Sequence, residues 1–469
     1  MTTATIPIRQ KVAGMALGAA VGDALGAPFE FGPPGQYAKH FPAPRYGSHT
    51  EMIGGGSFNW KAGEFTDDTQ MALTLTDSLL RNGHLNRHDI WTNWATWSTS
   101  APDVGTTTAR GLTGTAPGES AADHFNNGWR AAGNGAVMRT YPIALFGYGK
   151  HLELSAVMEM ARTQALLTHG DPEASWVPAV VSGLLFGLLH NSTIDDALSH
   201  AMNNIPDNER QMLFKAASLD HDPRTTMLSN GSAWGCFADA LWSIRHTTSY
   251  TQAVTAAIDI GGDTDTVACV AGAIAGTMYG VQSIPARWTN TLNGWAITGQ
   301  PQRSTRTDFQ RNDITSAAYA LAGLPDSKST VSESSAGPTQ VAPGLYAASL
   351  PGARTADKSF AVVSLCATGS AFKDFAQHRE FFIIDDLGNV NPHLAEVVTE
   401  AVETIEEFRN EGFKVLVHCH GGRSRTGLIL ASWRKHTTAA NPQPSCDWVE
   451  DVWPRVSWWN TDFTSWFHK

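Results

Sequence analysis

The chain opens with a glycine-spaced apolar segment at residues 14–30, GMALGAAVGDALGAPFE. Its glycines recur at every fourth position, a spacing that gathers them on one face of a helix. A face without side chains lets another backbone approach closely, so we predict a tightly packed core helix. Two acidic residues, Asp23 and Glu30, accompany the segment.

Two acidic tetrads open two further predicted helices. Residues 66–69, TDDT, precede an apolar pattern that ends at Asn82-Gly83, and residues 261–266, GGDTDT, precede the apolar segment VACVAGAIAGTMYG. Threonine or aspartate at a helix start is an ordinary N-cap. Each tetrad alone is therefore compatible with a purely structural role.

The two tetrads together point to a cation. Asp67, Asp68, Asp263 and Asp265 would repel one another if the fold brought them together without compensation. Their hard oxygen atoms suit Mg²⁺, Mn²⁺ or Ca²⁺, and two ions about 3.5–4 Å apart are feasible for such a set. An EF-hand is excluded because its loop spacing and closing glutamate are missing.

The amino-acid composition and pattern of the chain change near residue 326. Residues 1–325 alternate Ala/Leu/Met-rich segments with Gly/Pro/Asn loops, which predicts an all-α unit. Its expected helices include 152–168, 174–190, 232–245 and 265–280. Residues 326–342, DSKSTVSESSAGPTQVA, are rich in Ser, Thr, Pro and Gly, so we predict a flexible linker there.

Residues 343–469 have the pattern of a separate α/β unit. Three β-rich runs, 359–367, 379–386 and 413–419, are joined by a helical stretch at 392–412 between the last two. Alternating strands and helices predict a mostly parallel sheet.

Composition and charge restrict the class of protein. Hydrophobic residues make up 42% and charged residues 16% of the chain, which is typical of a globular protein. The net charge of -11 argues against a broad surface for nucleic acid or an anionic membrane, and we expect no membrane-spanning segment. Five cysteines without a Cys-x2-Cys pair indicate neither a disulfide framework nor a zinc site, so we expect a cytoplasmic location.

Six short motifs follow one another in a family-specific order. They are GMALGAAVGDALGAPFE, TDDT, PDVGTTT, GNGAVMR, LTHGD and GGDTDT. Together, over residues 10–300, they resemble the ADP-ribosylglycohydrolases of the dinitrogenase-reductase-activating type. The resemblance implies a compact all-helical domain with two Mg²⁺ or Mn²⁺ ions at the bottom of a cleft. The implied metal ligands are Thr66, Asp67, Asp68, Asp263, Asp265 and Thr266.

The same resemblance assigns residues around the sugar. Asp103 matches an acidic residue near the ribose, and Glu30 is a second candidate for handling water or substrate. Asn134, Gly135 and His169 match loops that contact ADP-ribose. Cleavage at the ribose passes through an oxocarbenium-like state, which needs an oriented sugar and an activated water. The implied substrate is an ADP-ribosylated protein or small molecule, usually modified on arginine; serine, thymidine and small-molecule linkages stay open.

The C-terminal unit contains a cysteine loop. Cys419 and Arg425 are separated by five residues and lie between a predicted strand and an apolar helix. A loop of this length can curl its N–H groups around a phosphate at the helix start, with Arg425 bidentate on two oxygens. The same positive field favours the thiolate of Cys419 as nucleophile. The loop residues expected to contact the phosphate or support the thiolate are Gly421, Gly422, Ser424 and Thr426.

Residues 343–469 thereby resemble the cysteine-dependent tyrosine and dual-specificity phosphatases. The resemblance implies a second activity on a phosphorylated substrate and an aspartate as general acid. Asp386, which lies 33 residues before the cysteine, is assigned this role, and Asp385 is the alternative. The unusual polarity of His420 and Arg423 argues against protein phosphotyrosine as the substrate.

We therefore predict a multidomain enzyme, with an all-α ADP-ribosylglycohydrolase-like unit and an α/β phosphatase-like unit. The alternative is a catalytically reduced ADP-ribose-binding protein with a regulatory phosphatase domain. The complete set of carboxylates argues against that alternative.

Overall fold

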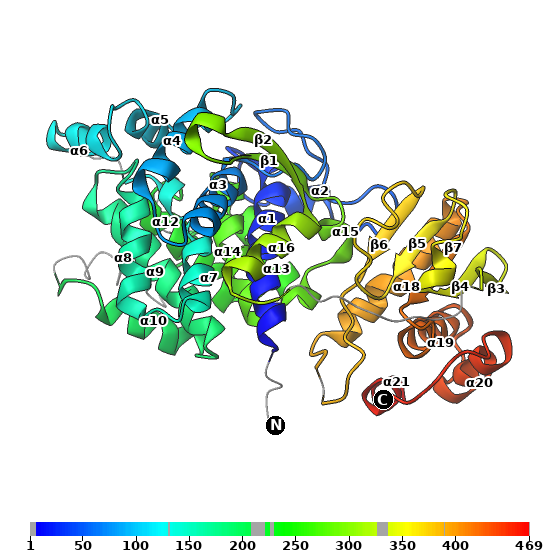
Figure 1. Ribbon diagram of the computed structural model, residues 1–469. Coiled ribbons are helices and arrows are strands. Elements are labelled where there is room, and N and C mark those ends of the chain that lie inside the picture. Colours follow the sequence, from blue (N-terminus) through cyan, green and yellow to red (C-terminus); the bar gives the residue numbers. More distant parts are fainter. Residues whose placement is uncertain are drawn as a thin grey trace.

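Two apolar helices form the centre of the helical part (Figure 1). In the computed structural model, α1 (Ile8–Gly26) packs antiparallel to α14 (Thr264–Tyr279), with Gly14 against Gly276 and Gly22 against Ala268. The stretch Ile8–Phe29 is long and apolar enough, by length and composition, to cross a membrane, but 94% of its apolar 18-residue window is buried inside the protein. It is the core helix that the glycine spacing predicts.

The structure describes residues 6–129, 132–207, 221–225, 229–325, 336–388 and 390–468. The helices around the central pair are α2 (Gln36–His40), α3 (Asp67–Asn82), α4 (Arg87–Ser98), α5 (Thr106–Gly111), α6 (Glu119–Asn126), α7 (Tyr141–Gly149), α8 (Leu154–Ala165), α9 (Pro172–Leu189), α10 (Ile194–Asn203), α12 (Ala233–Arg245), α13 (Tyr250–Asp259), α15 (Ala286–Thr289) and α16 (Arg311–Leu321). The four helices expected by range are confirmed as α8, α9, α12 and α14, with ends shifted by a few residues.

A small hairpin departs from the all-α expectation. The strands β1 (Asn293–Thr298) and β2 (Thr305–Gln310) pair antiparallel beside α3 and α16 (Figure 1). Trp295, Ala296 and Ile297 of β1 are consecutive buried residues. Because they do not alternate with polar residues, the usual period of a strand is hidden in the sequence.

The C-terminal part is built on a five-stranded sheet with the order β3-β4-β7-β5-β6. Only the β3–β4 pair is antiparallel, so the predicted mostly parallel sheet is confirmed. The strands are β3 (Thr339–Ala342), β4 (Leu345–Ser349), β5 (Ala361–Ser364), β6 (Gln377–Glu380) and β7 (Val415–Cys419). The helices are α17 (Leu350–Ala353), α18 (Leu394–Asn410), α19 (Ser424–Thr438), α20 (Pro442–Val452) and α21 (Thr461–Phe467).

Alternation along the central strands separates two cores. Val363 and Val417 belong to the larger core, which also contains residues of α18 and α19. Val362 and Leu416 belong to a smaller core on the other face, together with Phe372. This period of two is what places Cys419, at the end of β7, on the same side as α19.

The last residues of the predicted linker, 326–342, form a strand. Residues 326–335 lie outside the described part of the chain, and residues 339–342 form the edge strand β3. β6 also ends at Glu380, so most of the predicted run 379–386 is not strand. The missed strand β4 is short and rich in alanine, which carries little β propensity.

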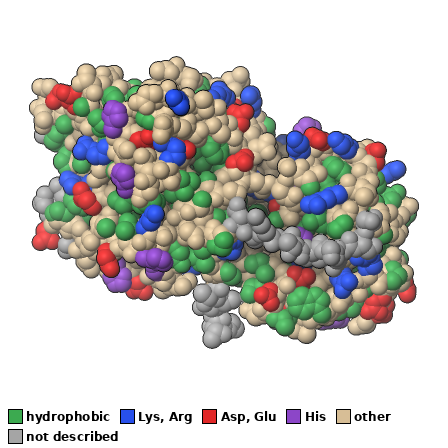
Figure 2. Space-filling view, viewed as in Figure 1, with side chains coloured by type: hydrophobic (Ala, Val, Ile, Leu, Met, Phe, Trp, Pro, Cys, Tyr) green, Lys and Arg blue, Asp and Glu red, His purple; other side chains and the backbone are tan. Residues whose placement is uncertain are grey.

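Buried ion pairs join the two parts. Arg287 lies between Glu51 of the helical part, at 3.1 Å, and Glu400 of α18, at 3.2 Å. Arg311 of α16 contacts Glu380 of β6 at 2.8 Å. On the face drawn in Figure 2, Lys and Arg side chains are interspersed with Asp and Glu on both parts. The two parts are therefore in close polar contact, although the sequence gives no sign of it.

Candidate active site

Glycines at the end of α1 allow the first turn of α14 to come into contact with it. A Cβ added to Gly22 would lie 2.0 Å from the carbonyl oxygen of Ala268, and one added to Gly26 would lie 2.6 Å from the Cα of Asp265. Neither position can hold a larger residue without moving a helix backbone. The close approach thus brings the second acidic tetrad to the end of α1.

Asp23 connects α1 to the first acidic tetrad. Its carboxylate accepts hydrogen bonds from the backbone N–H of Thr66 at 2.9 Å and of Thr69 at 3.0 Å, and from the Thr69 hydroxyl. Complete burial raises the pKa of Asp23 to about 6, although these hydrogen bonds favour its ionised form. Asp23 thereby fixes the start of α3, a role that the sequence analysis does not assign to it.

Hydroxyls from both tetrads meet at one carboxylate. The Thr266 hydroxyl donates to Asp68 Oδ2 at 3.3 Å, and the Thr66 hydroxyl donates to the same atom at 3.4 Å. The other oxygen, Asp68 Oδ1, is buried and has no hydrogen-bond partner among the described residues. A buried carboxylate oxygen without a donor is costly unless something else compensates its charge.

Glu30 lies beside the second tetrad. Carboxylate oxygens of Glu30, Asp263 and Asp265 all lie within 4.8 Å of one another. Glu30 Oε2 is buried and, within the described chain, has no hydrogen-bond partner. Converging hard oxygen atoms with unsatisfied lone pairs fit Mg²⁺ or Mn²⁺. The residues present therefore fit a divalent cation. Two of the three carboxylates, Asp263 and Asp265, are ligands expected from the sequence, and the third, Glu30, was expected to handle water or substrate.

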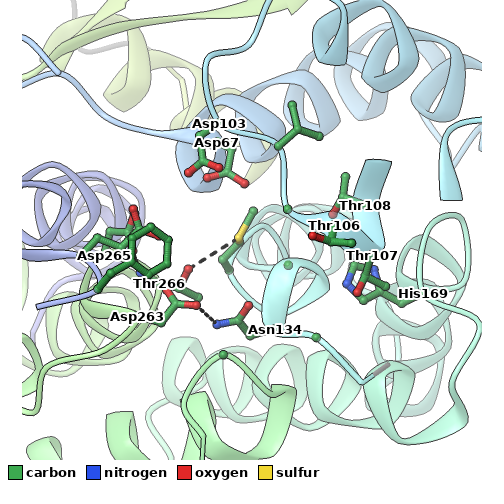
Figure 3. Close-up of a pocket in the computed structure, with 18 residues that line it drawn as sticks. Asp67, Asp103, Thr106, Thr107, Thr108, Asn134, His169, Asp263, Asp265 and Thr266 are labelled. Carbon is green, nitrogen blue, oxygen red and sulfur yellow. Dashed lines mark hydrogen bonds between the residues drawn. The ribbon is translucent and has the colours of Figure 1, made fainter. Parts of the chain in front are cut away.

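A cavity of about 330 Å³ opens onto this cluster. In Figure 3, Asp67 and Asp103 lie together on one side, Asp263, Asp265 and Thr266 on a second side, and His169 on a third. The predicted site residues that line the cavity are Glu30, Asp67, Asp103, Asn134, Gly135, His169, Asp263, Asp265 and Thr266. The structure thus brings together residues from distant motifs of the sequence.

Neighbouring carboxylates and burial shift the titration of this cluster. The pKa of Glu30 rises to about 8, chiefly through burial and then through Asp103 and Asp263. Burial, followed by Asp263, raises the pKa of Asp103 to about 6. The pKa values of Asp67, Asp68 and Asp265 lie well above the usual value, for the same two reasons. So much negative charge in so little space favours a bound cation.

Asn134 supports one of the carboxylates. Its side-chain N–H group donates to Asp263 Oδ2 at 2.8 Å and to the carbonyl oxygen of Asn230 at 2.9 Å (Figure 3 shows the bond to Asp263). The backbone N–H of Asp263 donates in turn to Asn230 Oδ1 at 3.2 Å. Asn134 therefore orients Asp263 as well as lining the cavity.

His169 is held in one orientation by a buried chain of hydrogen bonds. Arg139 Nη2 donates to the Thr168 hydroxyl at 2.7 Å, and that hydroxyl lies 2.8 Å from His169 Nδ1. Burial, with a smaller contribution from Arg139, lowers the pKa of His169 to about 3, so the ring is neutral. We assign the Thr168 hydroxyl as the donor to Nδ1, which leaves the proton of the neutral ring on Nε2.

Several residues of the cavity are missing from the sequence assignment. Thr106, Thr107 and Thr108 line it at the start of α5. They belong to the quoted motif PDVGTTT, in which only Asp103 received a role. Phe31 also lines the cavity; it is 66% exposed and has a positive φ of 63°. A positive φ in phenylalanine leaves no signal in the sequence.

The cysteine loop forms a second site at the end of β7. The Thr426 hydroxyl donates to Cys419 Sγ at 3.2 Å. Gly422 has a φ of 62°, and its carbonyl oxygen accepts a hydrogen bond from Trp453 Nε1 at 2.7 Å. Arg455 Nη2 donates to the carbonyl oxygen of Gly421 at 3.4 Å. The loop is therefore fixed from outside by the segment that follows α20 (Pro442–Val452).

Arg425 and the two candidate acids lie on one side of this loop. Arg425 Nη1 donates to the carbonyl oxygens of Leu365, at 3.0 Å, and Ile383, at 3.1 Å. Asp385 Oδ2 lies 3.6 Å from Arg425 Nε. Asp386 is exposed and accepts from the backbone N–H of the residue after it. Asp385, the alternative in the sequence analysis, is thus the aspartate beside the arginine.

The helical part of the chain is similar to known proteins. Residues 4–328 match the family described as ADP-ribosylglycohydrolase. The ADP-ribosyl-[dinitrogen reductase] glycohydrolase of Rhodospirillum rubrum is 32% identical over 298 residues, which cover 61% of this chain and 91% of the relative. The ADP-ribosylarginine hydrolase Tri1 of Pseudomonas putida (strain GB-1) is 29% identical over 288 residues, covering 60% of this chain and 73% of the relative.

A solved structure agrees with these sequence matches. The structure described as an ADP-ribosylglycohydrolase-related protein complex superposes with a TM-score of 0.53 and 30% identity, and the match covers 67% of this chain and 98% of that chain. The family match extends over more than half of the sequence and includes every residue of the acidic cavity. The chain belongs to the ADP-ribosylglycohydrolase family.

Proposed function

We propose that this chain hydrolyses the bond between ADP-ribose and a modified substrate in the acidic cavity. The observation that supports this most strongly is the convergence of Glu30, Asp263 and Asp265 at the cavity, next to Thr266, whose hydroxyl donates to Asp68. ADP-ribosylarginine on a protein is the preferred substrate, because two similar relatives are described as ADP-ribosylarginine hydrolases.

Two Mg²⁺ or Mn²⁺ ions would be held at the meeting point of α3 and α14. The residues proposed to hold them are Thr66, Asp67, Asp68, Asp263, Asp265 and Thr266. When bound, such ions lower the pKa of coordinated water and bind hydroxyl groups. The partnerless oxygen of Asp68 supports this proposal, since a cation would compensate its charge.

The chain's own side chains orient the sugar and move the proton. We assign Glu30 Oε2 to accept a proton from the attacking water, because this buried atom has no donor among the described residues. Asp103, which also lines the cavity, would accept a hydrogen bond from a ribose hydroxyl as the oxocarbenium-like charge develops. His169 Nε2–H and the hydroxyls of Thr106 and Thr107 supply donors for the ADP-ribose.

Release of ADP-ribose from an ADP-ribosylarginine protein tests this proposal. We expect release in Mg²⁺ or Mn²⁺ and none in a chelator. Glu30→Gln should lose activity, while Asp308→Ala, which removes an aspartate whose side chain is 87% exposed, should not. Parallel assays with serine-, thymidine- and small-molecule-linked ADP-ribose decide the linkage. Binding of ADP-ribose without any hydrolysis would instead support a catalytically reduced binding protein.

A second activity, a cysteine-dependent phosphatase, is proposed for the C-terminal part. The specific observation is the Thr426 hydroxyl on Cys419 Sγ at the start of α19, with Arg425 beside the same loop. The Cys419 thiolate would attack phosphorus, forming an S–P bond as the P–O bond to the leaving group breaks. Asp386 or Asp385 would protonate the leaving oxygen, and water would then cleave the S–P bond and release inorganic phosphate.

Hydrolysis of p-nitrophenyl phosphate tests the second activity. Cys419→Ser removes the thiolate and should abolish phosphate release. Cys446→Ser serves as the control, because Cys446 is also buried in this part but lies in α20, outside the loop. Equal rates for the wild type and Cys419→Ser would contradict the phosphatase assignment.

A further inference from the structure

The segment that carries both candidate acids is held by the helical part of the chain. Gln282, in the turn Val281–Ser283 after α14, donates from Nε2 to Asn391 Oδ1 at 3.0 Å and to the carbonyl oxygen of Val390 at 3.3 Å. Gln10 of α1 donates to the same carbonyl at 3.4 Å. Gln10 and Gln282 are buried, at 4% and 5% exposed, while Val390 and Asn391 are half-buried.

Asn391 in turn forms hydrogen bonds with Ile384, the residue before Asp385. Its Nδ2 donates to the carbonyl oxygen of Ile384 at 2.8 Å, and its Oδ1 accepts from the backbone N–H of Ile384 at 2.8 Å. Two opposed hydrogen bonds fix both polar groups of one peptide residue. The position of Ile384 is therefore determined by an asparagine that is itself held by Gln282.

The neighbouring residues connect this arrangement to the cysteine loop. The carbonyl oxygen of Ile383 accepts from Arg425 Nη1 at 3.1 Å, and Asp385 lies 3.6 Å from Arg425 Nε. Asn460 Nδ2 donates to Asp385 Oδ1 at 3.1 Å and to the carbonyl oxygen of Asp386 at 3.2 Å. Three consecutive residues, 383–385, are thus fixed by Arg425 on one side and by Asn391 on the other.

We propose that Gln282 is a positioning residue for the phosphatase reaction, holding the acid segment at the cysteine loop through Asn391 and Ile384. This inference rests on the phosphatase activity proposed above. General acid catalysis needs the carboxyl group within hydrogen-bond reach of the leaving oxygen, and small displacements cost much of its effect. The helical part thereby completes the second site, although it contributes no residue that touches the phosphate.

The chemistry of the contact supports positioning over simple packing. The Oε1 atoms of Gln10 and Gln282 are buried without a hydrogen-bond partner among the described residues. A buried oxygen without a donor costs free energy, so two apolar side chains would fill this space more stably. The amides instead orient the backbone, because the Nε2 atoms of both glutamines donate to the carbonyl oxygen of Val390.

The experiment compares two phosphate esters on the full chain. Gln282→Met keeps the side-chain volume and removes the amide. The turnover number for phenyl phosphate, whose leaving group needs a proton, should fall about tenfold or more. The turnover number for p-nitrophenyl phosphate should fall less, and the KM values and inhibition by vanadate should not change. Gln443→Met, at an exposed position of α20, is the matched control.

Further variants test the other residues of this arrangement. Asn391→Leu removes both hydrogen bonds to Ile384 and should show the same dependence on the leaving group; it replaces Gln282→Met if that variant does not fold, as judged by circular dichroism. Asp385→Asn and Asp386→Asn identify the acid, and Gln282→Met should add little to the variant that removes it. An active wild type with unchanged phenyl phosphate turnover in Gln282→Met and Asn391→Leu would overturn the inference. An inactive wild type would instead overturn the proposed phosphatase.

Discussion

In the helical part, the acidic cavity gathers side chains from Glu30 to Thr266, whereas the cysteine loop of the sheet part runs without interruption from Cys419 to Thr426. The cavity depends on glycines that let α1 and α14 touch and on Asp23, which holds the start of α3. The loop is formed by one strand end and one helix start, whereas the segment with its two candidate acids is held by Gln282 of the helical part. The nucleophile and the arginine of the second site are therefore encoded in one motif. The acidic cavity and the acid segment are instead vulnerable to changes far from them in sequence.

Cys419→Ser is expected to give the largest difference between the two activities. Serine is a far poorer nucleophile than a thiolate at neutral pH, so phosphate release should drop to background. ADP-ribose release should remain at the wild-type rate, because Cys419 lies in the sheet part. Parallel measurement of both products checks this, and a joint loss would show that the sites do not act independently.

Asp265→Ala should give the opposite result. Substituting residues that merely support a metal ligand typically costs about 10–100-fold in activity, so loss of a proposed ligand should lower ADP-ribose release by more than about a hundredfold. Phosphate release should persist, in the variant and in a chelator. Undiminished ADP-ribose release by the variant in a chelator would exclude the metal centre.

Asp23→Asn sharpens the comparison, because Asp23 lines neither site. The asparagine keeps the shape, but its NH₂ group would face donors that now meet a carboxylate oxygen. We expect ADP-ribose release to fall by about 10–100-fold, with a higher Mg²⁺ requirement. Titration with Mg²⁺ measures this effect. An unchanged metal requirement would show that Asp23 is not needed to hold the start of α3 in place.

The smallest functional effect is expected from Arg287→Met, which acts on stability. The substitution leaves Glu51 and Glu400 buried without their cation, and breaking such a pair costs about 3–5 kcal/mol. Urea unfolding should show this loss, while Arg306→Met, at an exposed position of β2, should change stability little. An unchanged midpoint for Arg287→Met would mean that the two parts are energetically independent.

The sequence predicted those features that depend on short-range pattern. Helix-forming segments, the cap at Thr66 and the loop after β7 are all encoded within a few residues. Their meeting in one cavity was inferred from a family resemblance, because no local pattern shows that residues 66–69 and 261–266 are neighbours. Asp23 was visible in the sequence, yet its acceptor role depends on where α3 begins in space.

Contacts between the parts could not be predicted. Gln282 and Asn391 are ordinary polar residues in their own segments, and only packing makes them partners. The same holds for Asp385, which differs from Asp386 by one position along the chain, while tertiary structure decides which of them faces Arg425. Strands β3 and β4 were missed because short, alanine-containing or polar segments become strands only when an existing sheet offers them an edge.

The pairing of α1 with α14 also has a consequence during synthesis. The ribosome completes α1 at Gly26 and reaches α14 only at Thr264, so the nascent helix waits for its partner. At about 5–20 residues per second, this delay lasts roughly 10–50 s. During that time the chain exposes a helix apolar enough to cross a membrane. Exposed apolar surface of this kind is prone to aggregation until α14 has been made.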